Sequence, residues 1–150
     1  MGEEAHTSMK VNKPVNVVVI GGGTAGLEAA CTATEVGCTT FLFEAKPYLG
    51  GLAREIAKLP AKDRINDFPN YLINRAKKLR NLYIFTNTTA TMEAIENLKP
   101  DVIVNATGAT PLLPPITGLH DRVDKENSKV LSIFGLIENF QKFNEMDLDG

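Results

Sequence analysis

A run of four β-branched residues that leads straight into a glycine cluster constrains this chain most. Residues 17–20 are Val-Val-Val-Ile, which is typical of a strand buried on both faces, and residues 21–23 are all glycine. Small residues then begin at Thr24 and predict a helix. Strand, glycine turn and helix in this order form the first half of a βαβ unit.

The glycines of this turn fit the pattern G-x-G-x-x-G. Gly21 permits the tight turn, Gly23 leaves room for a pyrophosphate beside the backbone, and Gly26 lets the helix pack close to the strand. The amide N–H groups of the first helical turn and the positive end of the helix dipole would face the phosphates. The predicted phosphate-binding residues are Gly23, Thr24, Ala25 and Gly26, and Gly21 belongs to the same site through the turn.

An acid follows the next predicted strand. Residues 39–43 form that strand, and Glu44 comes directly after it, close to the spacing of about 20 residues expected for the acid that binds a ribose hydroxyl. An ordinary βαβ unit with Glu44 as a solvated acid is the alternative. Gly50 and Gly51 come shortly after the acid, where they either let backbone approach a ligand or make a simple turn.

Hydrophobic periodicity and turn residues divide the remaining chain into alternating strands and helices. The predicted strands are 15–20, 39–43, 82–86, 101–109 and 130–133, and the predicted helices are 24–36, 63–80, 91–98 and 134–143. This alternation predicts an α/β fold, a Rossmann-like doubly wound parallel sheet with helices on both faces. Residues 1–13 lack periodicity and are expected to form a flexible leader before one dinucleotide-binding domain over 14–150.

Composition narrows the function classes. A net charge of -2 gives no basic face for nucleic acid, and the apolar runs are shorter than a membrane span. The N-terminus lacks the apolar core of a signal peptide, so a cytoplasmic location is expected. Cys31 and Cys38 form no CxxC pair. No residue pattern indicates a metal site, a catalytic base or a nucleophile.

Three motifs in order resemble the flavoproteins with two dinucleotide-binding domains. They are the glycine turn with Glu44, the Leu-Gly-Gly of residues 49–51, and the "ATG" strand end formed by Ala106, Thr107 and Gly108. Residues 14–120 are similar to the NADH:flavin oxidoreductases of the trimethylamine dehydrogenase and 2,4-dienoyl-CoA reductase type. Further matching stretches are 42–44, 96–102 and 114–118, with Ala57 and Pro60.

This resemblance implies FAD as the cofactor. Gly50, Gly51 and the strand end at residues 106–108 would pack against the part of FAD beyond the pyrophosphate. The intact enzyme would pass electrons from NAD(P)H through flavin to a second redox centre and act on a small molecule, as a possible homo-oligomer. Its iron–sulfur cluster and FMN would belong to a barrel domain outside this chain, and the present domain would be C-terminally truncated.

Three positions depart from the family pattern. Thr24 replaces a usual proline, Leu52 a frequent glutamine, and Asn105 an aliphatic residue. The glycine and acid positions are intact, so nucleotide binding is expected. Two alternatives stay open: a module that binds ADP or NAD without redox activity of its own, and a structural fragment whose site is vestigial.

Overall fold

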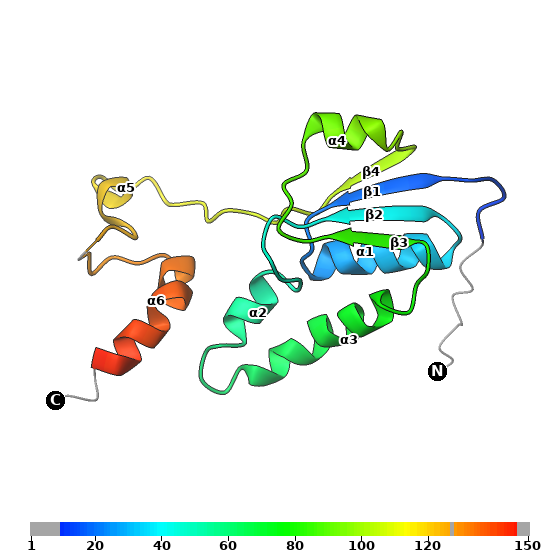
Figure 1. Ribbon diagram of the computed structural model, residues 1–150. Coiled ribbons are helices and arrows are strands. Elements are labelled where there is room, and N and C mark those ends of the chain that lie inside the picture. The colour runs from blue at the N-terminus through cyan, green and yellow to red at the C-terminus, as the bar shows by residue number, and fades with distance from the viewer. Residues whose placement is uncertain (1–9, 127, 147–150) are drawn as a thin grey trace, which may run out of the picture.

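The computed structural model describes residues 10–126 and 128–146, and most of the leader expected at 1–13 lies outside them. Four parallel strands form one sheet in the order β3-β2-β1-β4 (Figure 1). The strands are β1 Asn16–Ile20, β2 Thr39–Phe43, β3 Leu82–Phe85 and β4 Val102–Asn105. The predicted α/β fold with a parallel sheet is confirmed.

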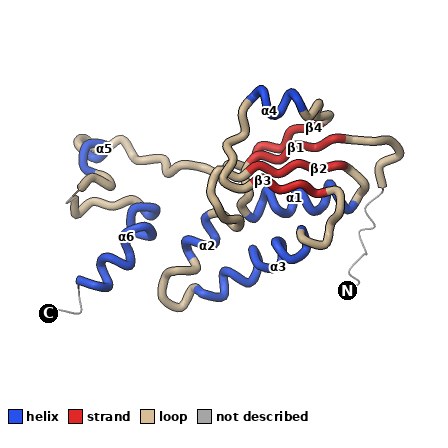
Figure 2. Tube along the Cα trace, viewed as in Figure 1, coloured by secondary structure: helices blue, strands red, loops and turns tan. Residues whose placement is uncertain are grey.

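Helices cover both faces of this sheet (Figure 2). The helical elements are α1 Thr24–Glu35, α2 Leu52–Ile56, the 3₁₀ turn η1 Asp63–Asn66, α3 Asp67–Ala76, α4 Met92–Asn97, α5 Leu119–Arg122 and α6 Ile133–Met146. In Figure 1, α1 and α3 lie below the sheet and α4 lies above it. Among the described residues, no helix is both long and apolar enough to cross a membrane.

Strand order places the switch point of the sheet between β1 and β4. From β1 the chain moves through β2 to β3, and the crossover through α4 then returns it to the opposite side of β1. In open α/β sheets, ligands bind at the carboxyl ends of the strands at such a point. The ends of β1 and β4 are joined there, because the N–H of Ala106 donates to the carbonyl of Ile20 at 2.8 Å.

β1 is buried on both faces, as its continuous apolar run predicts. Val17 and Val19 pack into the layer that also contains Leu27 of α1 and Leu72 of α3. Val18 points to the opposite layer, where it packs with Ile95 of α4 and other apolar residues. The two layers hold the central strand and its glycine turn in place.

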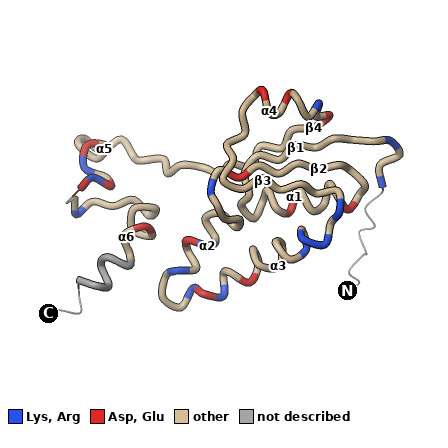
Figure 3. Tube along the Cα trace, in the orientation of Figure 1, with Lys and Arg blue, Asp and Glu red and all other residues tan. Residues whose placement is uncertain are grey.

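An arginine clamp ties α3 to α1 on the lower face. The guanidinium of Arg75 donates to Glu28 at 2.9 Å and to Glu35 at 2.5 Å. Hydrogen bonding to Arg75 lowers the pKa of the Glu35 carboxyl. Lys and Arg also gather just beyond the C-terminal end of α3, where the helix dipole favours positive charge (Figure 3).

Three predicted elements were wrong in detail. The strand predicted over 101–109 is shorter and covers Val102–Asn105. The helix predicted over 63–80 is split into η1 and α3, because Pro69 has no N–H and is tolerated only in the first turn of a helix. Residues 130–133 form no strand. The hydroxyl of Ser132 accepts a hydrogen bond from the N–H of Gly135 at 3.0 Å, which caps α6 and ends the extended segment.

The ends of the described chain attach in different ways. Val11 donates its N–H to the carbonyl of Val36 at 2.8 Å and packs against the core, so the chain is fixed before Pro14. After β4 the chain runs extended through residues 107–116 to α5 and α6, which lie to one side of the sheet (Figure 1). α6 returns to contact α2.

Candidate functional site

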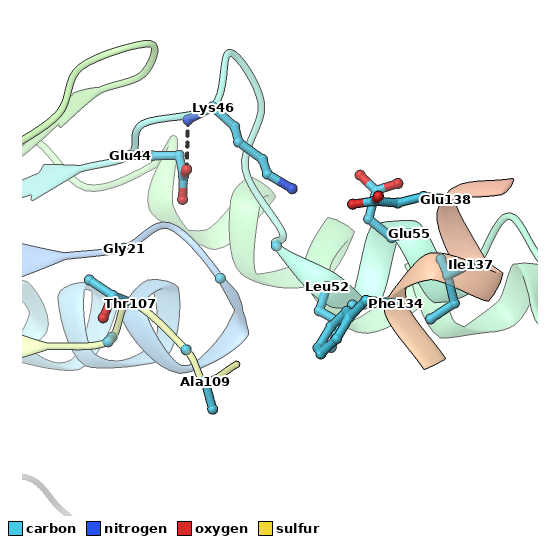
Figure 4. Close-up of a pocket in the computed structure, with 14 residues that line it drawn as sticks. Gly21, Glu44, Lys46, Leu52, Glu55, Thr107, Ala109, Phe134, Ile137 and Glu138 are labelled. Atoms are coloured by element: carbon cyan, nitrogen blue, oxygen red, sulfur yellow. Dashed lines mark hydrogen bonds between the residues drawn. The ribbon is translucent and has the colours of Figure 1, made fainter. Parts of the chain in front are cut away.

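A cleft with two adjoining lobes lies at the carboxyl ends of the strands. One lobe has a volume of about 280 Å³ and the other about 290 Å³, and both are lined by Gly21, Glu44 and Thr107. The first lobe extends toward α2 and α6 (Figure 4), and the second extends toward the loop after β3. The cleft therefore sits at the switch point that the strand order defines.

The glycine turn brings the start of α1 very close to the end of β1. A Cβ on Gly26 would lie 1.8 Å from the carbonyl oxygen of Gly21. Gly21 itself has φ +105°, and a Cβ there would lie 2.3 Å from the carbonyl oxygen of Ala106. No side chain fits at either position, so the turn requires glycine at both.

Gly23 differs from these two because it faces open space. A Cβ added to it would meet only the Cα of Gly51, at 4.0 Å. Gly23 is the N-cap of α1, and its carbonyl accepts the first helical hydrogen bond, from Leu27 at 2.9 Å. The amides of the first turn have no carbonyl partner within the helix, so they form a donor surface suited to an anion.

Glu44 lies beside this turn and links it to the end of β2. One carboxylate oxygen accepts from the N–H of Gly22 at 2.6 Å. The other accepts from the N–H of Lys46 at 2.7 Å, the bond drawn in Figure 4. The carboxylate is held by backbone, and each oxygen keeps a further lone pair for a hydroxyl donor. Glu44 is thus a positioned acceptor and not merely a solvated strand-end acid.

The diglycine loop pairs with the glycine turn. Gly50 donates its N–H to the carbonyl of Gly22 at 2.8 Å and forms an isolated parallel bridge with Gly23. Gly51 has φ +56°, and a Cβ there would lie 2.9 Å from the Cα of Gly23. Both residues line the contact between two backbones, so this loop is more than a simple turn.

The end of β4 forms the third side of the cleft. Asn105 is exposed, and its side-chain oxygen accepts from the N–H and hydroxyl of Thr107 at 3.3 and 2.9 Å. The unusual polar residue in this strand therefore serves the turn that follows it. Gly108 has φ +86° with open space around it. The structure brings all the predicted cofactor-binding residues to this end of the sheet.

Several lining residues were missed by the sequence analysis. Thr88, Thr89 and Ala90 line the second lobe, and the N–H of Thr88 donates to the carbonyl of Glu44 at 2.9 Å. Their position directly after β3 could have indicated them, because the carboxyl ends of parallel strands meet at one edge. Lys46 and Glu55 line the first lobe.

α6 closes the far end of the first lobe. Phe134 and Ile137 line it there together with Leu52 of α2, and Glu55 and Glu138 line the same lobe (Figure 4). A hydrogen bond from Lys58, and a weaker contribution from the hydroxyl of Tyr48, lower the pKa of Glu55. No local sequence signal links α6 to a glycine turn about 100 residues earlier.

The donor set suits a dinucleotide. One cleft combines the amide donors at the start of α1 with the carboxylate of Glu44 beside them. Close backbone contacts at Gly21, Gly26 and Gly51 surround these groups. FAD fits these features, since Gly23 presents the space that a diphosphate needs. Within the described residues, no group of His, Cys, Asp and Glu is arranged to hold a metal ion.

Comparison with known proteins agrees with this geometry. A family model described as FAD dependent oxidoreductase matches residues 16–110. The chain is 33% identical to NADH oxidase of Thermoanaerobacter brockii over 129 residues, which are 86% of this chain and 19% of that protein. It is 35% identical to N,N-dimethylglycine/sarcosine dehydrogenase of Chromohalobacter salexigens over 121 residues, 81% of this chain and 17% of that protein.

A solved structure of 2-naphthoyl-CoA reductase is also similar. Its TM-score is 0.76 at 28% sequence identity, and the match covers 91% of this chain and 20% of that one. The chain thus spans about a fifth of the length of the relatives it matches.

Proposed function

The chain belongs to the family of FAD-dependent oxidoreductases, and from this premise we propose that it is the FAD-binding domain of an NAD(P)H-dependent flavin oxidoreductase. One observation carries the proposal: Gly23 faces open space at the start of α1, while Gly21 and Gly26 on either side of it admit no side chain. A turn built only for tight packing would not leave the middle glycine free. Space there suits a diphosphate.

Each part of the cleft has a proposed role. The amides of Gly23, Thr24, Ala25 and Gly26 bind the pyrophosphate with the positive end of the α1 dipole. The carboxylate of Glu44, fixed by Gly22 and Lys46, accepts hydrogen bonds from the adenosine ribose. Gly50, Gly51 and the strand end at Ala106, Thr107 and Gly108 pack against the rest of the cofactor.

The chain's own residues bind and orient, and they do not catalyse. FAD supplies the hydride and electron transfer when it is bound. α2 and α6 border the first lobe with apolar side chains such as Leu52 and Phe134. Among the described residues, His120 is the histidine, and it lines neither lobe of the cleft, so the proposal gives it no role as a general base.

The activity of the whole protein is part of the same proposal. Because the relatives are about five times as long, we take this chain as one domain of a longer flavoprotein. NAD(P)H would donate electrons, and a second redox centre, FMN or an iron–sulfur cluster in other domains, would pass them to or from a small-molecule substrate. The relative named NADH oxidase supports the nicotinamide partner. A cytoplasmic homo-oligomer remains the expectation from sequence.

A second candidate function is a module that binds ADP or NAD without redox activity. Glu44 supports this module as well as it supports the FAD-binding domain, because its carboxylate suits the ribose of any adenine nucleotide. The two functions differ in what lies beyond the pyrophosphate. ADP ends at the diphosphate and NAD continues with a nicotinamide riboside. FAD continues with a flavin, for which we propose the surface made by Gly51, Gly108 and the neighbouring first lobe.

Competition between nucleotides separates the two functions. The purified chain is titrated with FAD, ADP and NAD by calorimetry, and the visible spectrum of the protein fraction is recorded after gel filtration. We expect FAD to bind more tightly than ADP or NAD and the flavin band to stay with the protein. Tight ADP binding with no affinity for FAD would replace the first function by the second.

A further inference from the structure

The diglycine loop is held by one side chain that the cofactor-binding set does not include. Arg54 lies half-buried on α2, and its Nε donates to the carbonyl of Leu49 at 2.6 Å. One terminal nitrogen of the same guanidinium donates to the side-chain oxygen of Asn70 on α3 at 3.0 Å. A planar guanidinium fixes the direction between its two acceptors.

The stem of Arg54 also covers the loop. A Cβ on Gly50 would lie 2.9 Å from both Cγ and Nε of Arg54, so this side chain packs directly on the glycine backbone. The N–H of Arg54 donates to the carbonyl of Gly51 at 3.1 Å. Arg54 therefore contacts the loop through its backbone, its stem and its guanidinium.

This loop sets one wall of the space at Gly23. The N–H of Gly50 donates to the carbonyl of Gly22, and the backbone of Gly51 lies against that of Gly23. α3, which carries Asn70, is itself clamped to α1 by Arg75. Contacts thus run from α1 through α3 and Arg54 to the diglycine loop, and from there back to the start of α1.

We propose that Arg54 is a positioning residue for the diphosphate site: through Leu49 and Gly50 it fixes the distance between the diglycine loop and the turn at Gly23. This inference rests on the proposed nucleotide binding at that turn. Arg54 acts on the loop and does not itself bind the nucleotide. Its loss lets the two backbones move relative to each other where the second phosphate lies.

ADP and AMP separate positioning from general stability. Both carry the ribose that Glu44 binds, but only ADP carries the second phosphate that reaches the space between Gly23 and Gly51. In Arg54→Met, which keeps the stem and loses the donors, we expect the Kd for ADP to rise about tenfold, as for one charge-assisted hydrogen bond. The Kd for AMP should change by less than about threefold, because AMP has no second phosphate and feels only a small part of the change in the loop.

Two further variants test the route and the charge. Arg54→Lys keeps one donor and should recover part of the ADP affinity. Asn70→Ala removes the anchor on α3 while the positive charge of Arg54 stays, and should raise the Kd for ADP about threefold with that for AMP unchanged. Because Asn70 is exposed, we expect Asn70→Ala to fold. It therefore tests the positioning role even if Arg54→Met does not fold. Arg64→Met, with a side chain 91% exposed, is the matched control.

The outcomes are distinct. Equal loss of ADP and AMP affinity in Arg54→Met, or no loss of either, overturns the positioning role while the nucleotide site stands. A wild-type chain that binds neither nucleotide overturns the proposed function, and this inference with it.

Discussion

The backbone of Gly21 lies so close to Gly26 that a Cβ on Gly26 would be 1.8 Å from the Gly21 carbonyl oxygen. No rotamer relieves this contact, because both partners are backbone or bonded directly to it. α1 can pack on the end of β1 only while Gly26 has no side chain.

Gly26→Ala should therefore destabilise the fold. We expect a loss of about 1–3 kcal/mol in the free energy of unfolding, because α1 must shift away from β1 to admit one methyl group. Urea unfolding followed by circular dichroism measures it. Gly23→Ala is the matched control, since its Cβ would meet only one atom, at 4.0 Å, and should change stability by less than about 0.5 kcal/mol. Equal losses in the two variants would contradict the packing argument.

Gly23→Val should abolish FAD binding and leave the stability of the fold nearly unchanged. Its backbone, with φ -70° and ψ -176°, accepts a β-branched residue. The side chain would occupy the space we assign to the pyrophosphate, so FAD binding should be lost while the unfolding midpoint is nearly kept. Calorimetric titration with FAD checks this. Wild-type affinity in the variant would remove the diphosphate from this position.

Glu44→Ala should weaken FAD binding by about 1–3 kcal/mol, because the ribose hydroxyls lose their acceptor. The N–H groups of Gly22 and Lys46 also lose the carboxylate as their acceptor, so the free energy of unfolding should fall as well. Glu96→Gln on α4, where the residue is exposed, controls for the change in net charge. An unchanged FAD affinity in Glu44→Ala would make Glu44 a structural acid only.

Acid should weaken the clamp between α1 and α3. The pKa of Glu35 is lower in the folded chain than in the unfolded one, where it is about 4.3. Its contribution is complete above that value and is lost as the pH falls through the lower folded-state pKa.

Arg75→Met measures this contribution. Near neutral pH it should cost about 1 kcal/mol, the sum of two partly exposed ion pairs. The difference from wild type should shrink as the pH falls below about 4.3. Urea titrations at several pH values give the curve, with Arg64→Met as the control. A difference that is the same at every pH would mean that Arg75 contributes by packing alone.

Local patterns predicted the centre of the fold. The β-branched run at residues 17–20, the glycines after it and Glu44 lie in one βαβ unit, where each residue is fixed by near neighbours. The strand order places them at a switch point, and the glycine contacts follow from packing two backbones together. Such features are encoded within about 30 residues, so a sequence can carry them.

Other features depend on contacts between distant residues. Arg54 holds Leu49 through a guanidinium directed by Asn70 on another helix, and no local pattern encodes that geometry. Phe134 lines the cleft because α6 folds back on α2. The apolar neighbours of Ser132 favour a strand at residues 130–133, whereas its hydroxyl caps a helix.

Backbone amide NMR of the chain during titration with FAD tests the central claim most directly, since that claim places the diphosphate on the first turn of α1. We predict the largest chemical-shift changes at the amides of Gly23, Thr24, Ala25 and Gly26. Changes should be small around Arg122, which lines a separate pocket with Ile116 and Leu119. Saturable FAD binding that leaves the first turn of α1 unshifted would contradict the account.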